Sequence, residues 1–396
     1  MRRLESGAFA IVGTGEVPTG RFERRPALES ALESSRQAIM DAGIDKSEID
    51  TVLTAGAIFS RKYNADMVFS RLVEELGLQE TAHLNAQVFA GGASSSAMLN
   101  VAGALVSTGM SRAVLCVHSD KLATGVDPQE GIDIFATLGI QEEWEMPFGL
   151  HFSAVAGLVT QRYMYETGTT ARQMASVCVS NRKWAELNPN AMFRKPLSIE
   201  EVLASRMLSE PLHAKESNVL ADGGSAFIVT TSERARELTS TPVFVLGHSS
   251  RVTHYSISQE SDITRFSYAQ VGRAALSEAR LEIEDMDIAE IYDSYPVFQL
   301  IALEELGFCD RGTAGAFVEA GGTWPGGRLP MTTNGGMLSQ GHTGAGGGVA
   351  ILVEAVRQLM GKAGDRQVTG AKFALDTSTG GTYMDVHVTI LGSDVP

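Results

Sequence analysis

The sequence predicts an α/β protein in which one strand–helix unit occurs twice. Short apolar runs alternate with helix-like runs along the chain, as they do in layered α/β folds. Two segments of the first half also have counterparts in the second half, in the same order. The 396 residues are enough for two or three domains, and 44% hydrophobic with 20% charged residues is the composition of a globular protein.

The alternation begins near the start of the chain. Ala8 to Gly13 and Thr51 to Ile58 are predicted strands, and Pro26 to Ala42 between them has apolar residues at helical spacing. Ser94 to Gly109 begins with three serines and ends in Thr-Gly, which predicts a helix with a polar start and a glycine stop. Ala113 to Val117 is the next predicted buried strand.

The repeat indicates a duplicated unit. Ala38 to Asp50 matches Ala275 to Asp287, since each is a helix end, a short break and an acidic turn before a strand. Ser94 to Gly109 matches Gly346 to Gly361, each an apolar helix with small residues at its start. Any α/β chain offers some such matches, but two in the same order favour duplication. Pro242 to Gly247 restarts the strand pattern.

We therefore expect two halves, residues 1–238 and 239–396. The first half contains extra material at about residues 119–206, where strand patterning is weak. Helices are predicted there at Ala154 to Glu166 and at Arg172 to Asn188. This extra material is predicted to form a loop domain inserted between the late strands of the first half.

Charge and composition exclude several classes of function. Lys and Arg number 32 against 47 Asp and Glu, and a net charge of -15 opposes binding to a phosphate backbone. Met1 to Gly7 lacks the apolar run of a signal peptide, and stretches such as Phe152 to Val159 are too short to span a membrane. The three cysteines have no metal-binding spacing. We expect a cytoplasmic protein that binds no nucleic acid, membrane or metal.

The densest glycine cluster surrounds a histidine. Asn334 to Gly348 contains eight glycines together with His342, and glycines let a backbone approach a ligand closely. His342 lies just before a predicted helix, whose N-terminus disfavours a protonated imidazole. We expect a neutral His342 that can act as a base. The alternative is a turn that packs two helices beside an exposed histidine.

A second cluster, Glu290 to Tyr295, contains Tyr292 and Asp293. It follows an acidic turn and precedes a predicted helix, so both side chains lie at a strand-to-helix turn. There they could stabilise a developing oxyanion by hydrogen bonding. For Tyr295 an aromatic core corner is the competing interpretation.

Two further glycine turns are candidate anion sites. Gly91 and Gly92 precede Ser94 at the start of a predicted helix, where exposed amides could bind an anion. Gly380 and Gly381 follow a predicted strand. For the first turn, close helix packing with an N-cap serine is the alternative.

These residues resemble the thiolase superfamily, and the most similar branch is that of thiolase-like proteins related to sterol carrier protein X (SCP2-thiolase). The motifs are NGGMLSQGHTGAGGG, EIYDSY, LADGGSAFIV and the closing glycine pair. The resemblance covers nearly the whole chain. It implies duplicated βαβαβαββ units in five α-β-α-β-α layers, with a loop domain in the first half. It also implies a homodimer that pairs an edge strand of the first half across a two-fold axis.

The sequence departs from this family at its nucleophiles. Thiolases place a cysteine at the start of the helix after the third strand, where this chain has Gly91 to Ser94. A second cysteine should precede the final glycines, but Asp376 to Thr379 contains none. The family asparagine that helps to hold an oxyanion water maps onto Tyr292, and only the Gly-His histidine remains, as His342. The cysteines present fall elsewhere, at Cys116, Cys178 and Cys309.

Without a nucleophilic cysteine, a covalent acyl-enzyme is not supported. Retro-aldol cleavage of a β-hydroxyacyl-CoA needs none: a base removes the hydroxyl proton, the carbon–carbon bond breaks, and amide donors hold the thioester enolate. Some cysteine-less members of the branch are implicated in such cleavage of steroid side-chain CoA esters, with a small partner that carries an OB fold and a zinc ribbon (DUF35 type). The resemblance thus implies coenzyme A as part of the substrate, no tightly bound cofactor, and such a partner.

In this hypothesis His342 is base or acid, Tyr292 is its partner and Asp293 orients them. The thioester oxygen would lie among the amides of Gly91 or Gly92 and of Gly380. Two alternatives stay open. One is an acyltransferase of the acetyl-CoA acetyltransferase type, with a serine such as Ser94 in place of the cysteine or with acyl transfer from a donor other than CoA. The other is a scaffold subunit without catalytic activity.

Overall fold

The computed structural model describes residues 5–56, 68–125, 127, 129–130 and 139–395. The first four residues of the segment examined for a signal peptide, the end of the predicted strand Thr51 to Ile58 and parts of the predicted loop domain lie outside these ranges.

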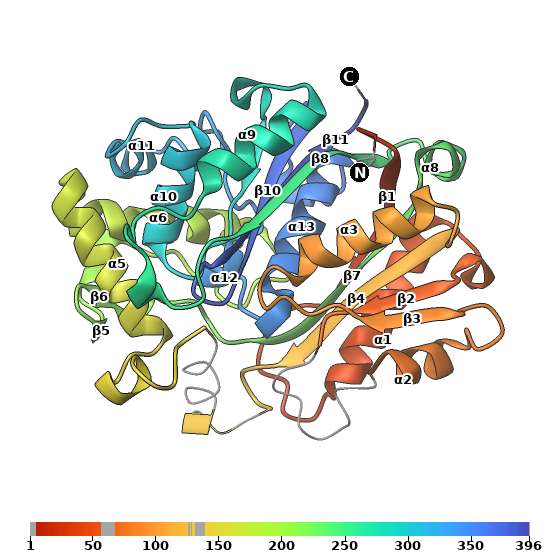
Figure 1. Cartoon of the computed structure of the whole chain (residues 1–396), viewed down its shortest axis with the longest axis horizontal. Coiled ribbons are helices and arrows are strands. Elements are labelled where there is room, and N and C mark those ends of the chain that lie inside the picture. Colours follow the sequence, from red (N-terminus) through yellow and green to blue (C-terminus); the bar gives the residue numbers. More distant parts are fainter. Residues whose placement is uncertain (1–4, 57–67, 126, 128, 131–138, 396) are drawn as a thin grey trace.

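A nine-stranded sheet runs through the described part of the chain in the order β3-β2-β4-β7-β1-β8-β11-β10-β9 (Figure 1). Its strands are β1 (Phe9–Glu16), β2 (Thr51–Thr54), β3 (Leu84–Gln87), β4 (Ala113–Lys121), β7 (Asp222–Thr231), β8 (Val243–Val252), β9 (Ile288–Glu290), β10 (Phe373–Gly380) and β11 (Asp385–Gly392). A separate ribbon pairs β5 (Met207–Ser209) with β6 (Leu212–His213).

The sheet consists of two halves with the same strand arrangement. In the first half β2 pairs in parallel with β3 and β4, and β7 pairs antiparallel with β4 and β1. In the second half β9 pairs in parallel with β10, and β11 pairs antiparallel with β10 and β8. The halves join where Ala10 and Ile11 of β1 pair with Phe244 and Val243 of β8.

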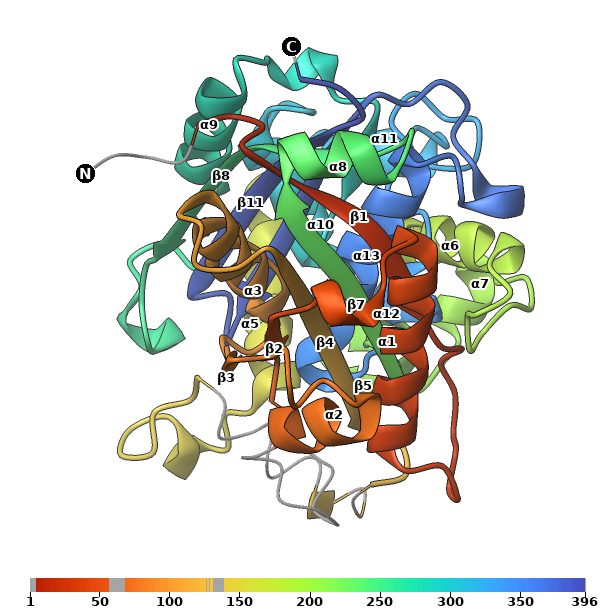
Figure 2. The same cartoon turned by 90° about the vertical axis from the view of Figure 1, so that its right-hand side faces the viewer.

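The helices complete the layers. These are α1 (Ala27–Ala42), α2 (Val68–Leu76), α3 (Ser94–Ser107), α5 (Phe152–Thr167), α6 (Ala171–Leu187), α7 (Ile199–Leu203), α8 (Ser232–Leu238), α9 (Tyr268–Ala279), α10 (Pro296–Leu306), α11 (Ala314–Glu319), α12 (Gly336–Ser339) and α13 (Gly347–Leu359). On the outer faces, α1 packs on β1 and β7 (Figure 2) and α9 packs on β8 and β11. Helices α3 and α13 pack against each other and share one apolar core with strands of both halves. The predicted α/β class and layered, duplicated fold are confirmed.

The two matched segments of sequence form the same local structure. Helix α1 ends at Gly43 and helix α9 at Arg280, both in the left-handed region with φ of 65° and 58°. A short 3₁₀ turn follows each helix, at Lys46–Glu48 and at Ile283–Asp285, and leads into β2 and β9. Glycine adopts this conformation without strain, whereas arginine does so at some cost. The boundary between residues 238 and 239 stays a prediction.

The extra segment of the first half lies between β4 and β7 and contains α5, α6, α7 and the β5–β6 ribbon. Both helices predicted there are present. Thr170 caps α6 through a capping box with Gln173. Helix α6 packs on α10, α11 and α12 of the second half, so the insertion reaches the glycine-rich loop that carries His342.

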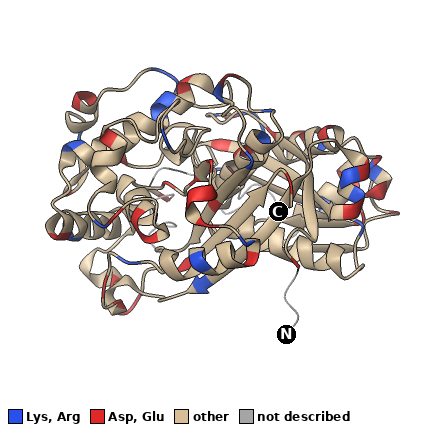
Figure 3. Ribbon diagram, turned by 90° about the horizontal axis from the view of Figure 1, so that it is seen from above, with Lys and Arg blue, Asp and Glu red and all other residues tan. Residues whose placement is uncertain are grey.

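Charged residues of both signs are mixed over the outer helices and loops (Figure 3). Within the described ranges, none of the helices has the length and apolar character needed to cross a bilayer.

Candidate active site

A pocket lies where four turns meet: the start of α3, the β9–α10 turn, the loop before α13 and the β10–β11 turn. It has about 540 Å³ of empty space, including its open mouth. The residues that line it are Gly91, Gly92, Phe152, Tyr292, Ser294, His342, Gly344, Ala345, Thr379, Gly381 and Tyr383. Thus the fold brings together five of the predicted site residues, namely Gly91, Gly92, Tyr292, His342 and Gly381.

Tyr292 and His342 form a pair in this pocket. The phenol oxygen of Tyr292 lies 3.4 Å from Nε2 of His342, and the two rings meet edge to face at 85°. On the other side of the imidazole, the backbone N–H of Gly344 donates to Nδ1 at 3.0 Å. A neutral imidazole that accepts at Nδ1 carries its proton on Nε2. His342 therefore presents a donor, not a free base, to the phenol.

Burial determines the protonation of both groups. It lowers the pKa of His342 to about 4, with a smaller contribution from the nearby His118. Burial also raises the pKa of Tyr292 above its ordinary value, and the charge of Asp293 adds to this shift. At neutral pH the site therefore holds a neutral imidazole and a protonated phenol.

The Tyr292 hydroxyl lies directly over the turn at Gly92. A Cβ added at Gly92 would overlap both this hydroxyl and the carbonyl oxygen of Thr379. The Tyr292 backbone N–H donates to Thr377 Oγ1 at 2.9 Å, which ties the tyrosine to β10. The phenol thus occupies the space into which a side chain at residue 92 would project.

The two predicted glycine turns meet at the same place. Gly91 and Gly381 both have a φ of +57°, which favours glycine. A Cβ at Gly91 would lie 3.5 Å from the Gly381 nitrogen, and one at Gly380 would overlap the Ala90 carbonyl oxygen. Gly380 packs behind the pocket and is not among its lining residues.

Ser94 supports this turn and does not line the pocket. Its buried hydroxyl donates to the carbonyl oxygen of Gly91 at 2.6 Å and accepts from the backbone N–H of Ala90 at 3.0 Å. Ser96 is equally engaged, since its hydroxyl is 2.8 Å from that of Ser378. Ser94 is therefore a structural residue in this arrangement, which corrects its expected place among the substrate-binding groups.

Asp293 also has a different position from the expected one. Its buried carboxylate accepts hydrogen bonds from the backbone N–H groups of Met337 (2.8 Å) and Leu338 (3.1 Å) at the start of α12, and from Nδ2 of Asn181 (2.7 Å). Burial nevertheless raises its pKa to about 7. Asp293 thus holds α12, which ends three residues before His342, and acts on the histidine only through this helix.

Sequence reasoning missed several lining residues, including Phe152, Ser294 and Tyr383. Ser294 lies inside the EIYDSY motif, and Tyr383 follows the closing glycines by two residues. Their proximity to recognised motifs is a signal that could have identified them. Phe152 begins α5 of the inserted segment, and its apolar surroundings contain no comparable signal.

The cysteines lie away from the pocket. Cys116 and Cys178 are buried, and burial raises the pKa of both thiols. Cys309 is half-buried with a pKa raised to about 11. Since all three lie outside the pocket lining and none favours the thiolate, no cysteine is placed to act as a nucleophile.

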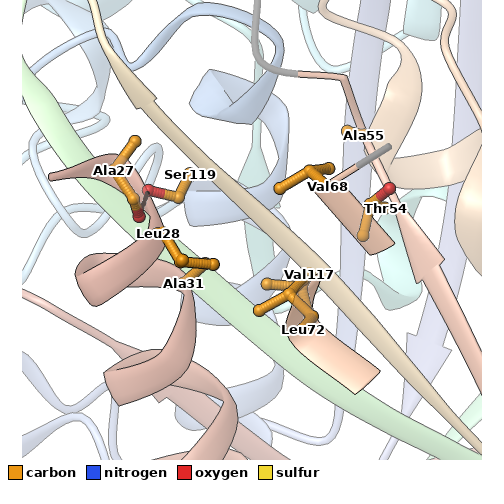
Figure 4. A pocket seen from close by; sticks show the side chains of 9 residues that line it. All are labelled: Ala27, Leu28, Ala31, Thr54, Ala55, Val68, Leu72, Val117 and Ser119. Atoms are coloured by element: carbon orange, nitrogen blue, oxygen red, sulfur yellow. Dashed lines mark hydrogen bonds between the residues drawn. The ribbon is translucent and has the colours of Figure 1, made fainter. Parts of the chain in front are cut away.

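A second cavity, of about 290 Å³, lies between α1, the start of α2 and the strands β2 and β4 (Figure 4). Most of its lining is aliphatic. The hydroxyl of Ser119 there donates to the carbonyl oxygens of Ala27 (2.6 Å) and Gly223 (3.0 Å). None of its nine lining residues titrates near neutral pH, so this cavity offers no acid–base chemistry.

Two equivalent α/β halves that enclose a Gly-His loop define the thiolase class. The family model described as "Thiolase C-terminal domain-like" matches residues 249–393. The chain is 31% identical to an acetyl-CoA acetyltransferase of Methanothermobacter thermautotrophicus, over 94% of this chain and 96% of the relative. It is also 31% identical to the 17-hydroxy-3-oxo-4-pregnene-20-carboxyl-CoA lyase of Mycobacterium tuberculosis, over 98% and 100% of the two chains.

The solved structure "Ltp2-ChsH2(DUF35) aldolase" superimposes with a TM-score of 0.87 at 30% identity, over the full length of both chains. Sterol carrier protein 2 of Oryctolagus cuniculus is 27% identical over 93% of this chain and 69% of its own length. The chain belongs to the thiolase superfamily and is a member of its SCP2-thiolase-like branch.

Proposed function

We propose that this protein is a carbon–carbon lyase that cleaves β-hydroxyacyl-CoA thioesters by a retro-aldol reaction. One observation carries the proposal. The Tyr292 hydroxyl lies over the Gly92 turn and against Nε2 of His342, in a pocket whose described lining contains no cysteine. A phenol thus stands where a covalent mechanism would need a nucleophilic side chain.

The reaction conserves protons, and this suits a neutral phenol. The proton that leaves the β-hydroxyl is replaced by one that the α-carbon gains. Tyr292 can therefore accept the hydroxyl proton while it gives its own proton to the α-carbon. The β-oxygen becomes a carbonyl, the bond between the α- and β-carbons breaks, and its electron pair passes through the thioester enolate to the new C–H bond. No ionised base is needed, which agrees with the raised pKa of Tyr292.

His342 and the glycine turns stabilise the charge that develops. The Nε2–H of His342 donates to the phenol oxygen while protons move, and the imidazole stays neutral throughout. We place the thioester oxygen at the turn of Gly91 and Gly92, beside Gly381, where backbone amides can stabilise an enolate. Asp293 is a positioning residue that holds α12.

The relatives supply the substrate class. Because full-length relatives include a steroid CoA lyase and an aldolase solved with a DUF35 protein, we propose a steroid side-chain β-hydroxyacyl-CoA as the substrate. We also propose a small partner of the DUF35 type with an OB fold and a zinc ribbon, and a cytoplasmic location. Coenzyme A would enter and leave as part of substrate and product.

The test uses the protein co-expressed with the DUF35-type partner encoded by its host. With 17-hydroxy-3-oxo-4-pregnene-20-carboxyl-CoA as the probe, we expect release of a 17-ketone and propionyl-CoA. Tyr292→Phe and His342→Ala should each slow turnover by on the order of 10²-fold or more. Tyr295→Phe is the matched control, because this buried phenol binds Ser153 (2.7 Å) and lies outside the pocket lining. Full activity in both site variants would overturn the proposal.

The same samples distinguish the alternatives. An acyltransferase would leave an acylated serine in acid-quenched protein, an outcome that the engaged hydroxyls of Ser94 and Ser96 oppose. A scaffold subunit would support the partner without any dependence on Tyr292 or His342.

A further inference from the structure

The pocket contains a second pair of hydroxyl groups opposite the Tyr292–His342 pair. Ser294, at the end of the β9–α10 turn, and Tyr383, in the β10–β11 turn, both line it. Their hydroxyls are joined by a hydrogen bond in which either oxygen can be the donor. The mechanism above makes no use of this pair.

The backbone and its neighbours hold Tyr383 firmly. Its φ is +63°, in the left-handed region that a bulky residue rarely adopts. Such conformations cluster at functional sites, where the surrounding structure enforces them. The Tyr383 ring is stacked on Phe298 with centroids 3.4 Å apart, and Phe152 lies nearly parallel to it at 6.3 Å. The direction of this hydroxyl is therefore set before substrate binds.

The two phenols of the pocket differ in their partners. The rings of Tyr292 and Tyr383 meet edge to face, with centroids 6.4 Å apart, so both face the same small space. Tyr292 has an imidazole beside it, whereas the partner of Tyr383 is a serine hydroxyl. Burial raises the pKa of Tyr383 well above its ordinary value, so it remains a neutral donor.

We infer that Tyr383, oriented by Ser294, is a catalytic residue that binds the β-oxygen of the substrate as this oxygen changes from hydroxyl to carbonyl. The inference rests on the proposed function and assigns its two ends. Tyr292 and His342 move the proton, and Tyr383 with Ser294 holds the oxygen by hydrogen bonding alone. No bond to the protein forms or breaks.

This division separates two reactions of the same site. Cleavage needs the β-oxygen and therefore Tyr383. Exchange of the α-hydrogens of propionyl-CoA with deuterium from D₂O needs enolisation of the thioester and Tyr292, but propionyl-CoA has no β-oxygen. Loss of the Tyr383 hydroxyl should therefore slow cleavage much more than exchange, whereas loss of the Tyr292 hydroxyl should slow both.

The experiment compares both rates in the complex with its partner, for wild type, Tyr383→Phe, Ser294→Ala and the control Tyr295→Phe. Cleavage of 17-hydroxy-3-oxo-4-pregnene-20-carboxyl-CoA is followed by product release, and exchange is followed by mass spectrometry of propionyl-CoA. We expect Tyr383→Phe to lower the ratio of cleavage to exchange by about 10²-fold, as for loss of one oxyanion donor. Ser294→Ala should lower the ratio by about tenfold, and Tyr295→Phe should leave it unmoved.

Each outcome decides a separate question. If the ratio is the same in Tyr383→Phe and Ser294→Ala as in wild type, the inference is wrong even when both rates fall. If wild type neither cleaves nor exchanges, the proposed function fails first. Thermal melting of each variant guards against misfolding, and Ser294→Ala keeps the test open should Tyr383→Phe not fold.

Discussion

The imidazole of His342 is bound on both sides, by the Gly344 N–H at Nδ1 and by the Tyr292 hydroxyl near Nε2. The pKa near 4 agrees with the neutral state expected from the sequence, but burial is the first cause. Because the folded state binds fewer protons than the unfolded chain between about pH 4 and 6.5, this group contributes stability above pH 6.5 that is lost as the pH falls.

The first residue-scale prediction concerns this tautomer. With ¹⁵N-labelled histidine, the His342 ring should give the spectrum of a neutral Nε2–H tautomer from pH 8 down to about pH 5. His342→Gln identifies the signal by its loss. Titration of the ring near pH 6.5, or a neutral ring with its proton on Nδ1, would contradict the donor role assigned here.

Helix α6 of the inserted segment connects to the catalytic loop through several bonds. Asn181 donates to Asp293, Asn188 Nδ2 donates to the Asn334 carbonyl oxygen at 2.9 Å, and Arg182 Nε donates to Ser339 Oγ at 2.9 Å. Together they hold both ends of α12. The insertion therefore helps to place His342, although most of its chain lies far from the pocket.

A second prediction tests this connection with Asn181→Asp. The change would put two carboxyl groups about 3 Å apart, and such a pair shares one proton, so the pKa of the pair should rise above the value near 7 of Asp293. Turnover of the variant should then be close to wild type near pH 6 and fall at least tenfold more than wild type by pH 8.5.

Ser180→Ala is the control on the same helix, because Ser180 binds Thr323 (2.8 Å) and not Asp293. A loss of turnover in Asn181→Asp that is equal at all pH values would indicate a general structural defect. No loss at any pH would show that the bond to Asn181 does not position α12. Melting temperatures at each pH separate unfolding from these effects.

At the scale of the whole molecule, β3 forms one edge of the sheet (Figure 1). The backbone N–H groups of Leu84 and Val88 donate inward, to Asp50 and Thr54. Because direction alternates along a strand, the N–H groups of Asn85 and Gln87 point away from β2. An unpaired edge of this kind is a template for pairing with another strand, so the homodimer remains a specific prediction.

The third prediction is that Gln87→Pro weakens this dimer. Proline removes one outward N–H and leaves the inward bonds of β3 in place. Sedimentation should show a dimer for wild type and for the control Gln87→Ala, and mostly monomer for Gln87→Pro. A stable dimer in Gln87→Pro would place the interface elsewhere.

Much of the site could be predicted because its residues lie in compact motifs. His342 and Tyr292 stand within short runs whose glycines and turn positions indicate function locally. Ser94 and Asp293 were recognised by the same signal, but their roles depend on which atoms lie opposite them. Their partners are the Gly91 carbonyl in one case and the amides of α12 in the other. No spacing along the chain reveals such distant pairs.

The sequence by itself determined the duplicated α/β unit, the missing cysteine nucleophiles and the Gly-His loop, because periodicity, glycine turns and residue identity are local properties of a chain. Only the tertiary structure decided which proton His342 carries, that Tyr292 covers Gly92, and that Tyr383 shares the pocket. Those facts depend on burial and on contacts between segments up to about 290 residues apart, such as that between Gly91 and Gly381, which only the packed fold brings together.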